Sequence, residues 1–435
     1  MKRLICLVLC AVLLVSLTGC SRTPEASRTD PETQPAVLPT QPVLEVPLET
    51  EAAEKKYEGI RLRYWSLLGE EDTEAAVLHQ AAEVFEKTTG AKVELNWLDG
   101  NPDALEAVLT GEGGADLFEV SGKNLETRFG QYALTLTDLA EKAGYREKSW
   151  DVLRTQILSR CNALKAVALR PHLYGLYYNR DRFDELGIEA TPAGWEEYVT
   201  FCRMLKEKGY EALAIDEARS NLLLELHMER ALGWDGLKET MVNAQWRRNE
   251  MAMAMIEAAI RFAENGYVVK GTPASYPKGQ DRLLQSNALL VAGSEVLCSQ
   301  VEASTMMEAN WGVFPYPGDG PGTGLLVDAD MLAVSSTCAD PEAAFDFAML
   351  LATGEFDQLR ADMTKGIPAD PNNVSPITGA NVCMKGATPQ APKWFAQDQS
   401  LLFSRLWNGW YKTAIYFADQ LNKLSRNFAS EKSVG

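Results

Sequence analysis

The sequence has few of the residues that metal binding and hydrolysis require. Only three of its 435 residues are histidine, His79, His172 and His227, and they lie far apart along the chain. Zinc sites gather several histidine, cysteine or carboxylate ligands at close spacing. The HExxH motif of zinc proteases and the GxSxG motif of serine hydrolases are both missing. The sequence therefore predicts no metal, no cofactor and no catalytic residue.

Cysteine is sparse and irregularly spaced. Of eight cysteines, Cys6 and Cys10 lie in an N-terminal apolar run and Cys20 follows it. The other five contain no CxxC pair and are widely separated: Cys161, Cys202, Cys298, Cys338 and Cys383. This pattern argues against a disulfide scaffold or a zinc site. Buried free thiols are expected for most of them, and one or two isolated disulfides remain the alternative.

Positive charge is in deficit. The chain has 42 Lys and Arg against 60 Asp and Glu, a formal net charge of −18. Nucleic acids and anionic membrane surfaces both attract proteins through positive charge. The composition therefore predicts no nucleic-acid partner and no electrostatic attraction to a membrane.

Long apolar runs are lacking, with one exception near the N-terminus. Leu4 to Leu17 is apolar, follows Lys2 and Arg3, and leads into Thr18-Gly19-Cys20. The run is shorter than the roughly 20 residues that span a bilayer, and its order is typical of a secretory signal. Its end also resembles the lipobox of bacterial lipoproteins. That resemblance implies removal of residues 1–19 and a lipid on Cys20; an ordinary secretion signal is the alternative.

The segment that follows has the composition of a tether. Residues 21–56 contain six prolines among Thr, Glu, Ser and Gln, with few large apolar side chains. Such a segment cannot bury enough surface to offset its ordering entropy, so residues 20–56 are expected to extend the lipidated end from a folded part. Roughly 380 residues remain after the tether, which favours two lobes.

The folded part begins with alternating strand and helix patterns. Apolar residues alternate from Ile60 to Tyr64 and again from Val93 to Trp97, and a helical pattern lies between them. Asp72 or Thr73 is expected to cap that helix, and Gly90 to end it. A second helix after Pro102 and a strand from Ala115 to Val120 complete a β-α-β-α-β series, which favours a parallel sheet covered by helices.

Three motifs resemble the family 1 extracellular solute-binding proteins of ABC importers. Phe85-Glu86-Lys87-Thr88-Thr89-Gly90 is similar to the phrase that closes the family's first helix. Tyr177-Tyr178-Asn179-Arg180-Asp181, followed by Gly187-Ile188 and Thr191-Pro192-Ala193-Gly194-Trp195-Glu196-Glu197, resembles its strand-to-helix signature. Thr191 is expected to cap the long helix and Pro192 to open it. The resemblance extends over most of residues 57–351.

The resemblance implies an α/β fold of two periplasmic-binding-protein-like lobes, each a mostly parallel sheet flanked by helices. Lobe 1 would contain residues 57–170 and about 328–366, and lobe 2 residues 171–327 and about 367–435. The lobes would close on ligand by a hinge. Gly318 to Gly324 fits a crossing loop, and no Walker lysine follows to suggest a phosphate loop.

The family resemblance implies capture of a sugar or oligosaccharide and its delivery to the permease subunits of an ABC importer. Aromatic rings stack on sugars, and polar groups bind their hydroxyls. Strand ends and crossing segments supply the candidate ligand residues: Trp65, Glu119, Ser121, Asn124, His172, Tyr174, Ser294, Glu295, Asp328, Asp330, Trp394 and Trp410. For Trp65, His172, the acidic residues and the tryptophans, a structural or solvated role is the alternative.

The sequence departs from the family at residues 327–330. Val327-Asp328-Ala329-Asp330 stands where members often have a Gly-Gly element. This difference points to a more acidic cleft, for which a cationic ligand, an amino sugar or a ligand that is not a sugar is an alternative. The prediction is a monomer anchored by lipid at the outer face of the bacterial cytoplasmic membrane. A ligand-sensing lipoprotein of the same fold is the first alternative, and a surface glycosidase with paired carboxylates is the second.

Overall fold

In the computed structural model, the described residues are 55–111, 114–215, 219–269, 279–390 and 400–431. The chain begins with the expected series of β1 (Arg61–Ser66), α1 (Ala75–Thr89), β2 (Lys92–Trp97), α2 (Pro102–Thr110) and β3 (Leu117–Ser121). β1 pairs in parallel with both β2 and β3, one on each side, because each helix returns the chain to the end of the sheet at which the strands begin. Gly90 ends α1 in the left-handed region, at φ 85°, as its position predicts.

In the part of the chain that the structure describes, eight strands form one sheet. The order along it is β2-β1-β3-β8-β4-β6-β5, and β7 pairs with β4 outside this path. The remaining strands are β4 (Val167–Asn179), β5 (Glu211–Ala214), β6 (Ala288–Gly293), β7 (Trp311–Phe314) and β8 (Leu326–Val334).

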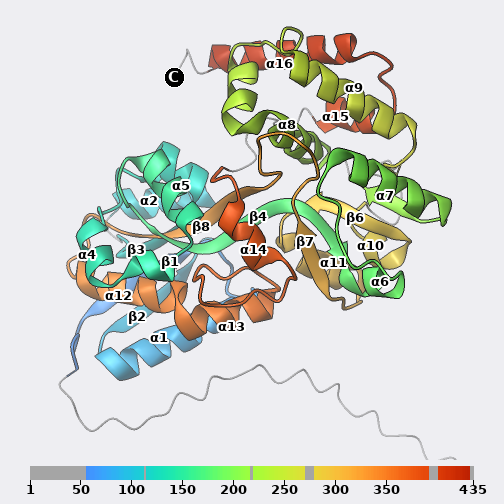
Figure 1. The fold of residues 1–435 in the computed structure, drawn as a ribbon. Helices are drawn as coiled ribbons and strands as arrows, with labels where there is room; N and C mark the ends of the chain where they lie inside the picture. The colour runs from blue at the N-terminus through green and yellow to red at the C-terminus, as the bar shows by residue number, and fades with distance from the viewer. Residues whose placement is uncertain (1–54, 112–113, 216–218, 270–278, 391–399, 432–435) are drawn as a thin grey trace, which may run out of the picture. The chain divides into compact units, whose positions relative to one another are not determined.

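β4 is the strand that joins the two halves of the molecule. Its first half pairs with β8, and its second half pairs with β6 and β7, always antiparallel. Figure 1 shows β4 as a long green strand running from one group of elements to the other. The expected two-lobed α/β fold is therefore confirmed, with one refinement: the sheet is continuous and mixed, since only β5 and β6 are parallel in the second half.

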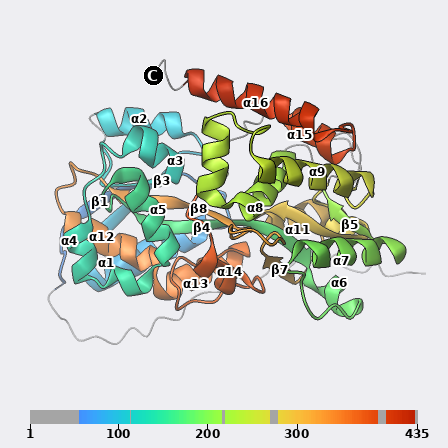
Figure 2. The same ribbon diagram turned by 45° about the horizontal axis from the view of Figure 1, so that its top comes forward.

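Helices cover both halves of the sheet (Figures 1 and 2). The first half carries α1, α2, α3 (Gly122–Asn124), α4 (Thr137–Lys142), α5 (Asp151–Cys161), α12 (Pro341–Ala352) and α13 (Gly354–Thr364). The second carries α6 (Arg180–Glu185), α7 (Trp195–Glu207), α8 (Ser220–Val242), α9 (Glu250–Glu264), α10 (Arg282–Gln285), α11 (Val296–Thr305), α15 (Ser400–Trp407) and α16 (Ala414–Glu431). α14 (Ala380–Gly386) contacts β7, β4 and α5.

Two helix starts differ from the sequence prediction. Glu74 is the residue before α1, so neither Asp72 nor Thr73 is its N-cap. α7 begins at Trp195 with Gly194 as N-cap, three residues later than Thr191 and Pro192 suggested. The Glu197 carboxylate accepts from the backbone N–H groups of Ala193 and Gly194, which satisfies donors that a Thr191 cap would have served.

One face of α7 is part of the core. Tyr198, Cys202 and Leu205 are buried in a cluster built mainly from α7, α8, α9 and α16. All five cysteines outside the N-terminal region are free thiols, and three are buried, as expected for most of them. Among the described residues, no helix is long and apolar enough to cross a membrane, and no metal-ligating group of three or more side chains is found.

Candidate functional site

One face of the sheet carries a polar stripe where β3, β8 and β4 lie side by side. Arg170 is opposite Asp330 and His172 opposite Asp328 across β4 and β8, while Ser121 of β3 is opposite Asp330. Directly opposed residues point to the same face, and residues two apart on a strand do so as well. A register shift between Ala168 and Arg170 marks a bulge just before the stripe, a feature that redirects side chains near functional sites.

Arg170 is the centre of a buried ionic network. Its guanidinium donates Nη2–H to Glu119, binds the Glu74 carboxylate through Nη1 at 3.0 Å, and binds Asp330 through Nε at 3.3 Å. Burial alone would lower the pKa of Arg170, but the carboxylates of Glu119 and Glu74 outweigh it and raise the pKa above its ordinary value. A cation this buried is stable only with such partners.

Glu119 ties the ends of β1 and β3 to that network. Its side chain is fully buried, and it accepts hydrogen bonds from the Tyr64 hydroxyl and from the backbone N–H of Leu67. Burial, with the nearby Glu119 charge, raises the pKa of Tyr64 well above its usual range, so the phenol stays a donor. Glu119 thus positions the segment that follows β1 and has no exposed surface for a solute.

His172 links the stripe to the segment after β6. Its Nδ1–H donates to Glu295 Oε1 at 2.6 Å, and its Nε2 lies 3.5 Å from Asp330 Oδ2. Glu295 Oε2 also accepts from the Leu173 backbone N–H at 3.0 Å. Although burial would lower the pKa of His172, Glu295 and Asp330 raise it well above its ordinary value. This shift favours the charged imidazolium. Although burial raises the pKa of Asp330, His172 and Arg170 together lower it below its ordinary value.

Tyr174 is an aromatic ring among carboxylates. It continues the alternation of Arg170 and His172 along β4 and is partly exposed. Burial raises the pKa of its phenol, and the charges of Asp328 and Glu295 raise it further. The side chains of His172 and Asp330 beside it are 22% and 23% exposed, so solvent reaches this part of the stripe but not Glu119.

Asp328 is held by Arg160 of α5. Arg160 Nη1 lies 3.0 Å from Asp328 Oδ1, and its side chain is only 3% exposed. Gly122 leaves room for this pair, because a Cβ there would collide with Arg160 Nη1 and lie 2.6 Å from Asp328 Oδ1.

The substitution Gly122→Ala is expected to lower the free energy of unfolding by about 1–3 kcal/mol, the usual effect of overpacking, because Arg160 and Asp328 must separate. Denaturant unfolding measures the change. Gly386→Ala is the matched control, since nothing lies within 4 Å of the added Cβ and it should cause no loss. Equal stability of the two variants would contradict the role of Gly122.

Seven of the twelve predicted ligand residues come together on or beside this stripe: Glu119, Ser121, His172, Tyr174, Glu295, Asp328 and Asp330. Ser121 also caps α3, since its hydroxyl accepts from the Asn124 backbone N–H. Ser294 precedes α11 and accepts from the Leu297 backbone N–H through its carbonyl.

The predicted tryptophans are placed differently. Trp65 alternates with Tyr64 on β1, so it faces the opposite side of the sheet, and its Nε1 is buried without a hydrogen bond among the described residues. Trp410 is 71% exposed, lies under the Arg405 guanidinium and contributes nothing to the stripe. Trp394 lies outside the described residues.

Sequence reasoning missed the basic residues that organise the stripe. Arg170 and Arg160 pair with predicted acidic residues, and Glu74 and Tyr64 complete the network. Arg170 could have been found from its spacing, because it precedes His172 by two residues on a strand whose partner has Asp328 and Asp330 at the same spacing. Arg160 and Glu74 come from helices distant in sequence and carry no such signal.

A hollow of about 490 Å³ lies where β1 and β2 end. Trp97, Asp99 and residues 69–72 line it, including the carboxylates of Glu70, Glu71 and Asp72. The carboxyl ends of parallel strands are where open α/β sheets bind ligands. The sequence placed Trp97 in a strand but did not predict it as a site residue.

The family model for bacterial extracellular solute-binding proteins matches residues 69–355. The match covers well over half of the chain, and the protein therefore belongs to that family. No curated protein matches the chain.

Several solved structures share the fold. The apo form of RafE from Streptococcus pneumoniae is similar with a TM-score of 0.70 at 16% identity, over 87% of this chain and all of that one. MalE from Xanthomonas citri, a sugar-binding protein, gives 0.66 at 16% identity, over 86% of this chain and 98% of that one. A binding protein of Bacillus subtilis in an open conformation gives 0.65 at 17%, over 88% and 100%.

Proposed function

We propose that this protein is an extracytoplasmic receptor that binds a sugar or oligosaccharide and delivers it to an ABC importer. The observation that carries the proposal is Tyr174, a partly exposed aromatic ring among Asp328, Asp330 and Glu295 at the strands that join the two halves. A sugar stacks its apolar C–H face on such a ring, and carboxylates accept hydrogen bonds from its hydroxyls.

Two further observations support a carbohydrate. The hollow beside Trp97 repeats the combination of an aromatic ring with carboxylates. Similar structures include RafE in complex with raffinose, a transporter protein in complex with stachyose, and a chitin oligosaccharide binding protein. A binding protein makes and breaks no covalent bond in its solute, which agrees with carboxylates that are held in ion pairs instead of poised for acid–base chemistry.

The proposal includes closure of two lobes around the solute. Lobe 1 is residues 57–170 with about 328–366, and lobe 2 is residues 171–327 with about 367–435. The strands β4 and β8 pass between them, and the bulge at Ala168 and Arg170 lies at the boundary. A hinge at these strands would bring Tyr174 and the Trp97 hollow toward one solute.

The proposed location is the outer face of the cytoplasmic membrane of a bacterium. The Cys20 lipid would anchor the chain, residues 21–56 would act as the tether, and a monomer would suffice, because one chain supplies both lobes. The partner is the permease of an ABC importer.

The function is tested by thermal unfolding of the full-length protein against mono- and oligosaccharides, amino sugars, polyols and peptides. A ligand at 100 times its Kd should raise the free energy of unfolding by about 2.7 kcal/mol. A sugar that stabilises the protein and is recovered unchanged supports the receptor. Consumption of the sugar would instead identify a glycosidase, and stabilisation by non-sugars alone would refute the carbohydrate ligand.

The substitution Tyr174→Leu is expected to weaken binding of the identified sugar about tenfold or more, because it removes both a stacking surface and a hydroxyl. Isothermal titration calorimetry measures the change. Tyr416→Leu, at a tyrosine that is 59% exposed, should bind the sugar as the parent protein does. An unchanged Kd for Tyr174→Leu would place the sugar elsewhere.

A further inference from the structure

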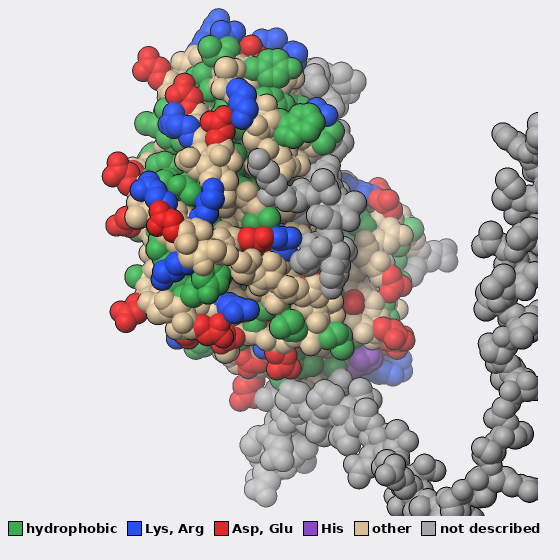
Figure 3. All heavy atoms as spheres, turned by 90° about the vertical axis from the view of Figure 1, so that its right-hand side faces the viewer, with side chains coloured by type: hydrophobic (Ala, Val, Ile, Leu, Met, Phe, Trp, Pro, Cys, Tyr) green, Lys and Arg blue, Asp and Glu red, His purple; other side chains and the backbone are tan. Residues whose placement is uncertain are grey.

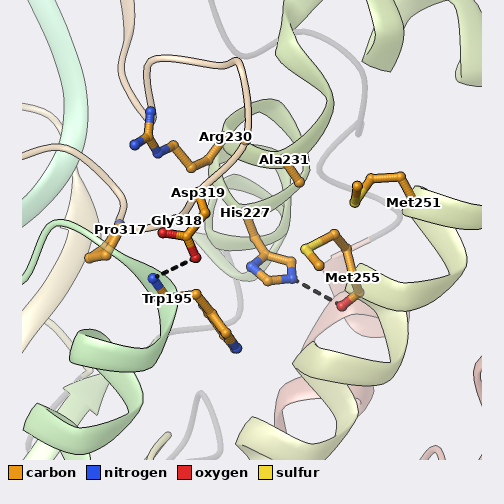
Figure 4. Close-up of a pocket in the computed structure, with 10 residues that line it drawn as sticks. Trp195, His227, Arg230, Ala231, Met251, Met255, Pro317, Gly318 and Asp319 are labelled. Carbon is orange, nitrogen blue, oxygen red and sulfur yellow. Dashed lines mark hydrogen bonds between the residues drawn. The ribbon is translucent and has the colours of Figure 1, made fainter.

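A second cavity lies in the half of the molecule built on β5 to β7. Its volume is about 260 Å³, and it is enclosed by the start of α7, by α8 and α9, and by the loop of residues 317–320 (Figure 4). Figure 3 views the molecule from the side of this half. The cavity is larger than an engineered cavity of about 150 Å³ that binds benzene, so one substituted aromatic ring fits.

The walls of the cavity are mainly apolar and polarisable. Trp195 forms one wall and Met251 and Met255 of α9 form another, with Ala231 above them. Trp195 is fixed from behind by ring contacts with Phe262 and Tyr316, at centroid distances of 5.6 and 6.5 Å. Thioethers make favourable contacts with aromatic rings and adapt to their shape.

His227 supplies a polar atom inside this apolar enclosure. The residue is 2% exposed and its Nε2 lies 3.0 Å from the Met255 carbonyl oxygen, to which only an N–H can donate. Burial lowers the pKa of His227 to about 4, so the ring is neutral and Nδ1 carries a lone pair. Among the described residues, nothing donates a hydrogen bond to Nδ1, and Figure 4 shows the ring between Trp195 and Met255.

The rim carries one charge of each sign. The Arg230 guanidinium donates to the Gly322 carbonyl, and the Asp319 carboxylate accepts from the Trp195 backbone N–H at 3.4 Å. Because the two opposite charges at the entrance favour neither cations nor anions, the apolar walls and the single hydrogen-bond acceptor determine which ligands bind.

This cavity is separate from the polar stripe. The stripe is formed by residues of β3, β4 and β8, whereas the cavity is lined by residues of α7, α8, α9 and the loop of residues 317–320. None of these lining residues belongs to the stripe, so the two sites are distinct. From these observations we propose that the cavity binds a small neutral aromatic molecule that donates one N–H or O–H hydrogen bond to His227 Nδ1.

The test compares indole with benzothiophene, which has nearly the same shape but no N–H, by equilibrium dialysis of the full-length protein in detergent. Indole is expected to bind about 3- to 10-fold more tightly, as one hydrogen bond provides. His227→Phe should abolish this preference while benzothiophene still binds. His79→Phe, at an exposed histidine outside the cavity, is the matched control and should keep it.

Met255→Trp provides a second variant that keeps the imidazole but fills the cavity, and it should bind neither probe. Equal affinity for indole and benzothiophene in the parent protein would overturn the hydrogen bond to His227. Loss of indole binding in Tyr174→Leu would overturn the separate cavity, because indole would then occupy the stripe. Either result leaves the sugar experiment unaffected.

Discussion

Replacing Arg170 with methionine is expected to lower the free energy of unfolding by about 3–5 kcal/mol, the range for removing one member of a buried ion pair. Methionine keeps much of the apolar stem but leaves three carboxylates without their shared cation. Glu119 is affected most, because it is fully buried and, among the described residues, retains only the Tyr64 hydroxyl and the Leu67 N–H as donors. Denaturant unfolding gives the change directly.

An exposed ion pair offers the control for Arg170. Arg61 pairs with Glu94 at 2.9 Å on neighbouring strands, and its side chain is 69% exposed. Arg61→Met should change the free energy of unfolding by less than about 1 kcal/mol. Adding Glu119→Gln to Arg170→Met should recover part of the loss, because it removes the uncompensated charge. If Arg61→Met and Arg170→Met lowered the free energy of unfolding by similar amounts, the argument that burial makes the Arg170 network important for stability would be wrong.

The sequence predicted the elements of the fold well where a local signal determines them. Alternation predicted β1 and β2, and Gly90 marked the end of α1 because a left-handed residue is needed there. The predicted start of α7 was wrong because the side chains of Thr191 and Glu197 can accept hydrogen bonds from the same backbone N–H groups. In the structure, the Glu197 carboxylate accepts them. The mixed sheet was not foreseen, since the direction of a strand pairing is set by the path of the whole chain.

The candidate site was only partly predictable, for a similar reason. A strand end pointed to Glu119, and the crossing segments pointed to His172 and Asp330. Nothing local indicated that these side chains would join one network through Arg170. Ion pairs between residues far apart in sequence depend on the register of β4 against β8. Several positions expected to contact solute therefore also hold the two halves together, and under the proposed function a solute would compete with this network for the same carboxylates.

The buried His227 and the partly exposed His172 are expected to change the pH dependence of stability in opposite directions. His172 has a raised pKa, so its contribution is complete below about pH 6.5 and is lost as the pH rises through its folded pKa. His227 has a pKa lowered to about 4, so its contribution is present above pH 6.5 and is lost as the pH falls toward 4. One proton changes the free energy of unfolding by about 1.4 kcal/mol per pH unit, which gives His227 a total on the order of 3 kcal/mol.

Urea unfolding of the parent protein, His172→Gln and His227→Phe, measured from pH 4 to the alkaline side of pH 6.5, separates the two effects. The difference between each variant and the parent cancels the carboxylates that titrate in acid elsewhere in the chain. His172→Gln should remove the decline on the alkaline side, because Glu295, Asp330 and Asp328 then face no titrating cation. His227→Phe should flatten the decline between pH 6.5 and 4; Asp319 and Arg230 are the charged residues at the rim of its cavity. A variant whose pH profile runs parallel to that of the parent would show that its histidine binds protons equally in the folded and unfolded chains, and the electrostatic assignment of that residue would then be wrong.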